Sequence, residues 1–235
     1  MIIFFLLLIN NIDVKIDSLK AALEQNPDIR TIIQLNKYYL QKGELYNGIK
    51  LLKDYEGHFT SEKSIIIYKI GENYFFAGKI ILARQEYLRL VGRFPNAEIA
   101  NDALMRLFLI EQARKDTVLL KRMANSIYLF EIDQFDAAED SIKSLLKTKI
   151  GDYAYFYLTV LYNKKDDLAQ TLSALNELNN SFPDHTIFNA VLLLAEVNLK
   201  LGNKEDAQNI LEDLIIKEPT SIYAVRAREI LKENF

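Results

Sequence analysis

Apolar side chains recur along the chain at gaps of three and four residues, separated by short polar breaks. Before Gly78, for example, stand Ile67, Ile70, Gly71 and Tyr74. This spacing puts side chains on one face of a helix, because residues three and four apart are neighbours on a helix surface. The same spacing returns along most of the sequence and predicts about a dozen helices and no sheet. The expected fold class is therefore all-α.

The predicted helices come in pairs that repeat at roughly 34 residues. Two stretches have identical spacing: Gly78, Ala83, Tyr87, Leu90 and Pro95 in one, and Gly202, Ala207, Leu211, Leu214 and Pro219 in the other. Weaker copies begin near Gly43, Ala138 and Thr171. Each copy reads as a first helix, a short turn and a second helix. Five copies with a shared pattern make the repeat a strong signal as a set.

Small residues and prolines allow the two helices of each repeat to pack closely and to end at defined positions. Glycines at the turns tolerate positive φ. A small residue near the start of the second helix (Gly48, Ala83, Ala207) lets two antiparallel helices approach closely. Proline at the end of the second helix stops it, because proline lacks the N–H and clashes with the preceding turn. The pattern predicts stacked antiparallel helix pairs.

This pattern resembles the tetratricopeptide repeat over roughly residues 29 to 235. The resemblance implies a superhelical solenoid of antiparallel helix pairs and a non-enzymatic role in binding other proteins or peptides. A set of Lys, Asn and Arg that some such arrays use to bind a peptide carboxylate is not retained on the first helices. A carboxylate clamp for chaperone tails is therefore not expected.

Two segments of the sequence resemble a narrower group of proteins. The string AxxxYxxLVxRFPNAEIANDALMRL at Ala83 to Leu107 is similar to BamD-like outer-membrane assembly lipoproteins and to Tol–Pal coordinator (YbgF-like) proteins. The ending Glu218 to Phe235 resembles the closing phrase of the coordinator proteins. This resemblance implies an envelope adaptor in the periplasm or cell envelope of a Gram-negative-type bacterium. The sequence has no cysteine, so the likeness does not extend to a lipid anchor.

The first residues allow two interpretations. Ile2 to Ile9 is an unbroken apolar run, too short for a bilayer span of about 20 residues but suited to the central part of a secretory signal. No basic residue precedes it and no small-x-small cleavage site follows before Ser18. The alternative is an apolar segment packed on the first repeat, which would favour a cytoplasmic repeat module of a larger complex.

The spacing of the first helices predicts the domain organisation. They begin near Ile29, Ser64, Leu119, Asp152 and Phe188, so one gap is 55 residues where the others are 33 to 36. A further helix over Glu98–Arg114 fills the long gap, with Ala103, Leu104, Leu107, Phe108 and Glu111 at helical spacing. We expect an apolar segment (1–17), an N-terminal arm (18–96), an extra helix and hinge (97–118) and a C-terminal arm (119–235). The alternative is a degenerate repeat within one continuous superhelix.

Composition excludes several function classes. The chain has 235 residues with 29 basic and 32 acidic side chains, so no global basic field would recruit nucleic acid. The lack of cysteine excludes disulfides, thiolate zinc sites and cysteine nucleophiles. Half of the residues are hydrophobic and only 8 are glycine and 4 proline, which is typical of a globular helical protein.

Candidate chemistry is sparse. His58 and His185 have no second histidine nearby and read as surface residues rather than metal ligands. Gly71 to Lys79 (GENYFFAGK) has the wrong spacing for a phosphate loop, so Gly71 and Gly78 read as a close-packing glycine and a turn glycine. The acidic stretch from Glu131 to Asp140 straddles a turn and reads as solvated charge. We predict no catalytic residues, no cofactor and no metal. A glycan hydrolase would need a groove-facing acid pair, and only Glu72 and Glu196 hold such positions.

Aromatic residues mark the candidate binding surface. In tetratricopeptide arrays the first helices line a concave groove, which would place six side chains toward it: Tyr68, Glu72, Phe75, Tyr153, Phe156 and Val160. Tyrosine gives a large contact area at low entropy cost and suits peptide capture. The alternative is a groove filled by the neighbouring arm or by the chain's own N-terminus. The expected partner is a protein or peptide segment, with membrane association only through partners, and the chain is a monomer or a homodimer.

Overall fold

The structure is a computed structural model that describes residues 2–113 and 115–235, with side chains described from residue 11 onward. Whether the side chains of Ile2 to Ile9 pack as core lies outside the described residues. Over the described residues the chain forms thirteen α-helices and one 3₁₀ turn and contains no strand, so the all-α prediction is confirmed. None of the described helices is long and apolar enough to cross a membrane.

Contacts between helices divide the chain into two compact units, one ending at Gln134 and the other covering Phe135–Phe235. Unit 1 contains α1 (Ile2–Gln25), α2 (Ile29–Gln41), α3 (Leu45–Tyr55), η1 (Glu56–His58), α4 (Lys63–Phe76), α5 (Ile80–Arg93), α6 (Ile99–Gln112) and α7 (Thr117–Glu131). Unit 2 contains α8 (Phe135–Lys143), α9 (Gly151–Lys164), α10 (Leu168–Ser181), α11 (Phe188–Lys200), α12 (Lys204–Lys217) and α13 (Ile222–Asn234). The predicted hinge at 97–118 and the two predicted arms stay predictions.

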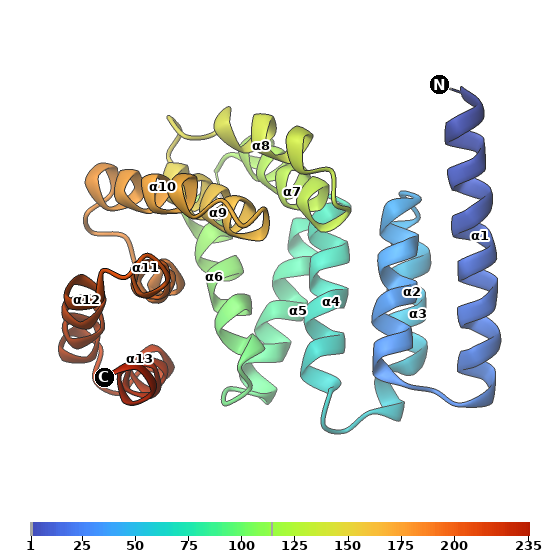
Figure 1. Cartoon of the computed structure of the whole chain (residues 1–235). Helices are drawn as coiled ribbons and strands as arrows, with labels where there is room; N and C mark the ends of the chain where they lie inside the picture. The colour runs from blue at the N-terminus through green and yellow to red at the C-terminus, as the bar shows by residue number, and fades with distance from the viewer. Residues whose placement is uncertain (1, 114) are drawn as a thin grey trace. The chain divides into compact units, whose positions relative to one another are not determined.

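In unit 1 each helix from α1 to α6 packs against the next and α7 packs on α4, and in unit 2 all consecutive helices pack against one another (Figure 1). The first helices of the pairs, α2, α4, α7, α9 and α11, begin within two residues of the predicted starts. The extra helix predicted over 98–114 is also present, as α6, and it packs on both α5 and α4. The sequence pattern therefore located the helix pairs correctly.

Five turns between paired helices share one backbone geometry. Each has a residue at positive φ, and these are Gly43, Gly78, Asp133, Asp166 and Gly202, with φ of 74°, 66°, 64°, 58° and 84°. At the first turn, the Gly43 N–H donates to the Leu40 carbonyl at 2.9 Å and the Glu44 N–H donates to the Tyr39 carbonyl at 2.8 Å. The other four turns repeat these two bonds. This is the Schellman motif, which satisfies the last carbonyls of the first helix.

The left-handed residues are spaced 35, 55, 33 and 36 residues apart, the same intervals as the predicted helix starts. Aspartate occupies this position in two turns, because its short polar side chain tolerates the left-handed region better than most. The interpretation of the acidic stretch from Glu131 to Asp140 as solvated charge misses this backbone role of Asp133.

Small residues let the helices of unit 1 approach closely, as predicted. A Cβ at Gly48 would collide with Asn36 Oδ1 and would stand 2.7 Å from Asn73 Nδ2. Those two amides are themselves joined, since Asn73 Nδ2 donates to Asn36 Oδ1 at 2.6 Å. Gly48 of α3 therefore leaves the space in which α2 and α4 form a buried hydrogen bond.

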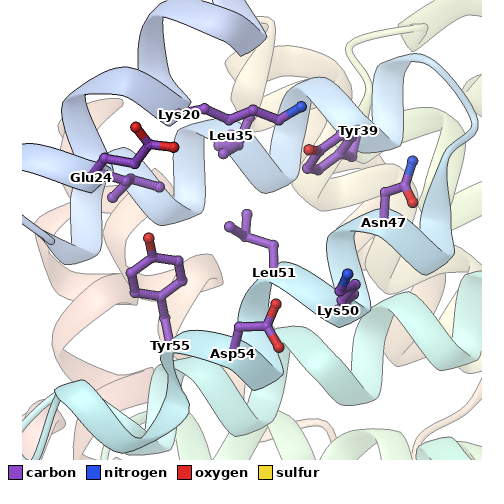
Figure 2. Close-up of a pocket in the computed structure, with 10 residues that line it drawn as sticks. Lys20, Glu24, Leu35, Tyr39, Asn47, Lys50, Leu51, Asp54 and Tyr55 are labelled. Carbon is purple, nitrogen blue, oxygen red and sulfur yellow. The ribbon is translucent and has the colours of Figure 1, made fainter.

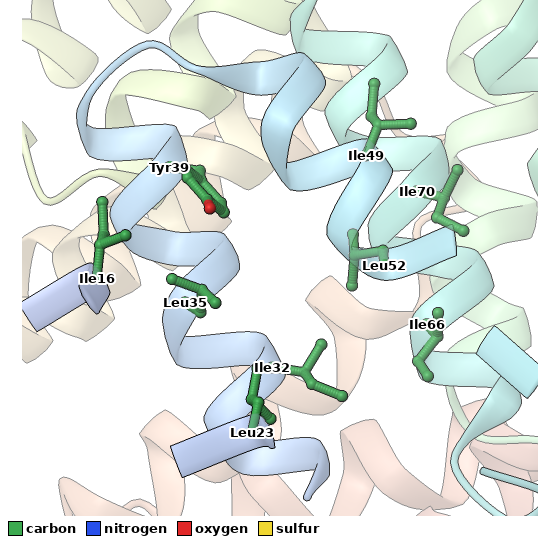
Figure 3. Packing of buried hydrophobic residues seen from close by; sticks show 9 residues of the cluster. All are labelled: Ile16, Leu23, Ile32, Leu35, Tyr39, Ile49, Leu52, Ile66 and Ile70. Atoms are coloured by element: carbon green, nitrogen blue, oxygen red, sulfur yellow. The ribbon is translucent and has the colours of Figure 1, made fainter. Parts of the chain in front are cut away.

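The core at the start of unit 1 is built from four helices (Figure 3). Its buried residues are Ile16 and Leu23 of α1, Ile32, Leu35 and Tyr39 of α2, Ile49 and Leu52 of α3, and Ile66 and Ile70 of α4. Each fully buried aliphatic side chain contributes roughly 1.5–3 kcal/mol. The part of α1 that carries Ile16 and Leu23 is thus held by the first helix pair.

Helix α6 shows a buried face different from the one suggested by its large apolar residues. Phe108 is 56% exposed, whereas Arg106 is only 3% exposed. The other buried positions are Ala100, Ala103, Leu109 and Ile110. The rotation follows from packing: alanines allow α6 to lie close to its neighbours, and Arg106 finds a buried acidic partner. Of the positions whose spacing predicted this helix, Ala103 is buried, Leu104 and Leu107 are partly buried and Phe108 is exposed.

The shared turn gives a stability prediction. Gly43→Ala places a Cβ on a left-handed residue with no atom within 4 Å, so the cost is in the backbone alone. We expect a loss of about 1–2 kcal/mol in the free energy of unfolding, measured by urea denaturation. The control is Gly92→Ala at an exposed helical position that is also open, where we expect a gain of up to about 1 kcal/mol. Changes of the same sign in both variants would contradict the turn assignment.

Candidate partner-binding sites

The three predicted groove residues of α4 lie in the interior of unit 1. Tyr68 is 7% exposed, Glu72 is 1% exposed and Phe75 is fully buried. The structure brings them together on one helix, but it covers them in the free chain. A role for these side chains in partner binding stays a prediction.

Glu72 is held by two other helices. The Arg106 guanidinium of α6 binds it through two bonds, Nε to Oε1 at 2.8 Å and Nη2 to Oε2 at 2.7 Å. The Tyr87 hydroxyl of α5 donates to Oε1 at 2.5 Å. The guanidinium carbon also lies 5.6 Å from the centre of the Phe75 ring. One buried carboxylate therefore joins α4, α5 and α6.

The electrostatics of this cluster favour the charged pair. Burial alone would raise the pKa of Glu72, but the Arg106 charge and the hydrogen bonds outweigh it and hold the pKa below 4.5. Burial would lower the pKa of Arg106, and the Glu72 charge raises it well above its usual value instead. A general acid needs a raised carboxyl pKa. This argues against the hypothesis of a glycan hydrolase that uses Glu72 as its acid.

Gly71 makes room for the cluster. A Cβ at this position would stand 2.7 Å from Cε1 of the Tyr87 ring. The glycine next to Glu72 thus lets the tyrosine reach the carboxylate. The prediction that Gly71 is a close-packing glycine and Gly78 a turn glycine is confirmed.

The other three predicted groove residues belong to α9 in unit 2. Tyr153 is 3% exposed and Phe156 is 5% exposed, while Val160 is partly buried. The helix is buried on most of its surface, with ten buried residues among its fourteen. The two sets belong to separate units. Binding of a partner by this second set also stays a prediction.

An open groove lies elsewhere in unit 1, between α1 and α3 and above α2 (Figure 2). It has a volume of about 380 Å³. Leu23, Leu35 and Tyr39 lie at its base but are only 2%, 0% and 8% exposed, and Leu51 is partly buried. Lys20, Glu24, Lys50 and Asp54 form its exposed rim, together with Asn47 and Tyr55. We name this surface the α1–α3 groove.

The charges on the rim of the α1–α3 groove follow the same sequence order on both flanking helices. Each flanking helix carries a lysine and, four residues later, an acid: Lys20 and Glu24 on α1, Lys50 and Asp54 on α3. The Lys20 ammonium lies 5.8 Å from the centre of the Tyr39 ring. Sequence reasoning missed this surface, although the strings KAALE and KLLKD that carry it are visible in the chain.

Unit 2 has a cavity of its own between α10, α11 and α12, with a volume of about 530 Å³. Its apolar lining includes Phe188, Val191 and Ile210. His185 lies at its edge and is fixed on both sides: Nε2 lies 2.9 Å from Asn179 Oδ1, and Nδ1 accepts from the Ile187 N–H at 3.1 Å. Burial lowers the pKa of His185. This histidine is therefore a structural part of the α10–α11 connection.

The acidic stretch around the turn at 133 is occupied by ion pairs. Asp133 lies 2.7 Å from Lys37, and Glu131 lies 3.7 Å from Lys69, both within unit 1. In unit 2, Glu139 binds Lys143 and Lys165 at 2.7 and 3.0 Å. Within the described part of the chain, no three His, Asp or Glu side chains converge as metal ligands would.

Comparison with known proteins identifies the repeat. The family model of the tetratricopeptide repeat matches residues 153–185 and 189–221. Two segments of unit 2 therefore match the tetratricopeptide repeat. The two matched segments correspond to α9–α10 and α11–α12, and the same turn geometry at residues 43, 78 and 133 continues the helix-pair architecture into unit 1. The fold is an all-α, tetratricopeptide-type solenoid of helix pairs.

Solved structures with similar helix arrangements are remote. The TPR2AB domain of yeast Sti1, in a complex with pHSP90, is 17% identical over 94% of this chain and 90% of that one, with a TM-score of 0.42. BtubC (BKLC) from P. vanneervenii is 12% identical over 95% and 91%, with a TM-score of 0.39. The P58(IPK) tetratricopeptide domain is 17% identical over 95% and 74%, with a TM-score of 0.35. Likeness at this level says nothing about what the chain binds.

No curated protein matches the chain in sequence. The closer resemblance to BamD-like and Tol–Pal coordinator proteins therefore stays a prediction.

The buried cluster of Glu72, Arg106 and Tyr87 predicts that in the variant Arg106→Met the stability depends on pH in the direction opposite to that of the native chain. In the native chain the pKa of Glu72 is lowered on folding, so its contribution to stability is present above pH 4.5 and is lost as the pH falls through the folded pKa. In Arg106→Met the carboxyl stays buried without its cation, which raises its folded pKa. Stability should then fall as the pH rises above 4.5, with a loss of about 3–5 kcal/mol at pH 7.

Urea unfolding of the full chain at pH 4, 5.5 and 7 measures this effect. The double variant Glu72→Gln with Arg106→Met is the control, because the amide oxygen introduced by the first substitution still accepts from Tyr87 and no charge is stranded. It should recover most of the lost stability and show little pH dependence from this site. A pH-independent midpoint for Arg106→Met would refute the assignment.

Proposed function

We propose that this protein is a non-enzymatic scaffold that binds a segment of another protein. The α1–α3 groove is the observation that carries the proposal, because it is an open hollow with a charged rim on a helix-pair framework. Helix-pair solenoids present extended surfaces of this kind, and partner peptides lie along them. The two matched tetratricopeptide segments support the same role.

The chemistry of the interior supports a scaffold over an enzyme. Glu72, one of the two acids on predicted groove positions, is saturated by Arg106 and Tyr87 and shielded from solvent. Glu196 belongs to the other unit. A pair of acids poised on one substrate would need both side chains exposed at a shared surface.

A crosslinking experiment in cells of the source organism tests the scaffold role. A photoreactive phenylalanine analogue is placed at Asn47 on the groove rim, and for comparison at Gln208 on α12. We expect an adduct with one partner protein, identified by mass spectrometry, that also binds the purified full chain. If no position gives an adduct with a protein that binds the purified chain, the scaffold proposal fails.

The finer form of the proposal places this scaffold in the cell envelope, as an adaptor. The supporting feature is the phrase at Ala83 to Leu107, which forms α5, the connection after it and most of α6. The apolar run Ile2 to Ile9 supports the same location as the central part of a secretory signal.

The intact mass of the protein and cell fractionation test the location. Expression in a Gram-negative host should remove roughly the first 10–20 residues and place the protein in the periplasm. An uncleaved chain in the cytosol would contradict the envelope role. It would instead support a cytoplasmic module of a larger assembly that uses the same binding surfaces.

A further inference from the structure

The exposed sides of the five second helices, α3, α5, α8, α10 and α12, are comparable position by position, because each helix follows a turn of the same geometry. Counted from the left-handed residue of each turn, the third, seventh and tenth positions are exposed in all five pairs. Gaps of four and three residues place these positions in one stripe along the helix. Packing within a helix pair therefore does not decide which side chains stand in the stripe.

The stripes of unit 1 differ in chemistry from those of unit 2. In unit 1 they carry apolar, amide and basic side chains and no acid, namely Tyr46, Lys50 and Lys53 on α3 and Ile81, Gln85 and Leu88 on α5. In unit 2 they carry acids, one lysine and small or amide side chains, namely Asp136, Asp140 and Lys143 on α8, Ala169, Ser173 and Asn176 on α10, and Glu205, Asn209 and Glu212 on α12. Only the unit 1 stripes combine large apolar with basic side chains.

The apolar side chains of α5 stand on the crest of the helix. Ile81 is 76% exposed and Leu88 is 44% exposed, and the adjacent Leu82 is exposed as well. The buried side of the helix is the opposite one, formed by Ala83, Tyr87 and Leu90. Large aliphatic side chains that gather on an exposed face without a role in the core indicate an interaction surface.

Basic side chains surround these apolar residues. Lys79 and Arg84 are exposed on α5 and the residue before it, and Lys50 and Lys53 are exposed on α3. Within the described part of the chain, none of these four cations takes part in an ion pair. The acid of α3, Asp54, is also exposed and borders the α1–α3 groove together with Lys50, but the four cations outnumber it.

The two stripes belong to neighbouring helices. The Arg89 guanidinium of α5 donates two bonds to Glu56, at 2.6 and 3.1 Å, and Glu56 begins the 3₁₀ turn that follows α3. Arg89 also binds Glu86, the acid of α5, so both of these carboxylates already have a cation. We name the side of unit 1 that carries the two stripes the α3–α5 face. It is basic and apolar.

We propose that the α3–α5 face binds the surface of an anionic phospholipid bilayer, with the aliphatic side chains of α5 among the lipids and the basic side chains of both helices at the headgroups. This inference does not rest on the proposed scaffold function, and it departs from the expectation of membrane association only through partners. Lysine and arginine around exposed apolar side chains are typical of helices that lie in a membrane interface. Tyrosine, present here as Tyr46, is enriched in the same region.

Other occupants fit the α3–α5 face less well. A second copy of the chain would bring two basic faces together, and like charges at an interface are costly. A protein partner would need a hollow shaped to receive the crest of α5 and acids placed opposite the cations. A fluid anionic lipid surface meets both needs without a matched shape, so the combination of crest and charge favours a bilayer.

Vesicle flotation with the full-length protein tests the proposal. Vesicles with about 30% phosphatidylglycerol in phosphatidylcholine should bind the protein at least about tenfold more tightly than pure phosphatidylcholine at low salt. Ile81→Gln should weaken binding to the anionic vesicles about tenfold, because it removes an inserted aliphatic side chain. The matched control is Ile216→Gln on α12, one turn beyond Glu212, because Ile216 is also 76% exposed. Its binding should equal that of the native chain.

Charge removal tests the role of the cations. The variant Lys53→Gln with Arg84→Gln should bind the anionic vesicles about 25-fold more weakly, since each basic side chain near an anionic surface strengthens binding about fivefold. The matched variant Lys204→Gln with Lys217→Gln removes two exposed cations from α12 and should bind as the native chain does. Circular dichroism establishes that each variant is folded.

A single tryptophan reports insertion directly, because the native chain contains none. In Leu88→Trp the emission should shift to the blue on anionic vesicles and be quenched by brominated lipid. In Ile216→Trp neither change should occur. This measurement does not depend on the stability of the glutamine variants.

The proposal is overturned if the native chain does not bind anionic vesicles, if Ile81→Gln and Ile216→Gln weaken binding equally, if the cation variant binds like its control, or if Leu88→Trp emission stays unshifted. A photoreactive residue at Gln85 that crosslinks to a protein instead of lipid in cells would also overturn it, in favour of a protein partner on this face. The scaffold function is tested separately by the adduct formed at Asn47 or Gln208, so either proposal can fail without the other.

Discussion

Each helix pair of this protein depends on a chain reversal within about three residues, and that reversal requires one residue in the left-handed backbone region. The Schellman geometry at the five turns satisfies the last carbonyls of the first helix, and within each unit it directs the second helix back along the first. Apolar stripes can then meet along a whole helix length. Helix pairs can stack only when the turns and the apolar residues repeat at the same interval. Here the two intervals are the same at every pair.

The buried ion pair between Glu72 and Arg106 joins the extra helix, α6, to α4, where the regular series of helix pairs is interrupted. Replacement of such pairs by apolar side chains is often neutral for stability, but removal of one partner is costly. We expect the pair to contribute to specificity, because a buried Arg106 on α6 needs the carboxylate of α4 as its partner. It also explains how three helices share one core without a regular repeat at that position.

The sequence was sufficient for the helix pairs because their pattern is local. Apolar periodicity, the turn glycines and the terminal prolines each act within one pair, so the first helices were located within two residues.

Features that depend on contacts between pairs were not accessible in this way. The burial of Arg106 depends on an acid 34 residues earlier, and the aspartates at 133 and 166 look like ordinary turn charges. The groove rim requires knowledge that α1 and α3 flank the same helix. The burial of Tyr68 and Phe75 shows the same limit, since helix periodicity does not tell which face a later helix covers.

The salt bridge between α4 and α6 has a consequence for how the chain bears mechanical load. Most of the extensive helix contacts here join neighbours in sequence, and a pulling force would separate such a stack one pair at a time. At α4–α6 the force would act on an ion pair between residues that are 34 positions apart in sequence. Separation of the pair would leave both charges without a partner until water reaches them, which is costly in free energy. That segment would resist as a block and then yield in one larger step. A repeat array of this kind would lengthen in unequal increments, with its stiffest part in the first half of the sequence.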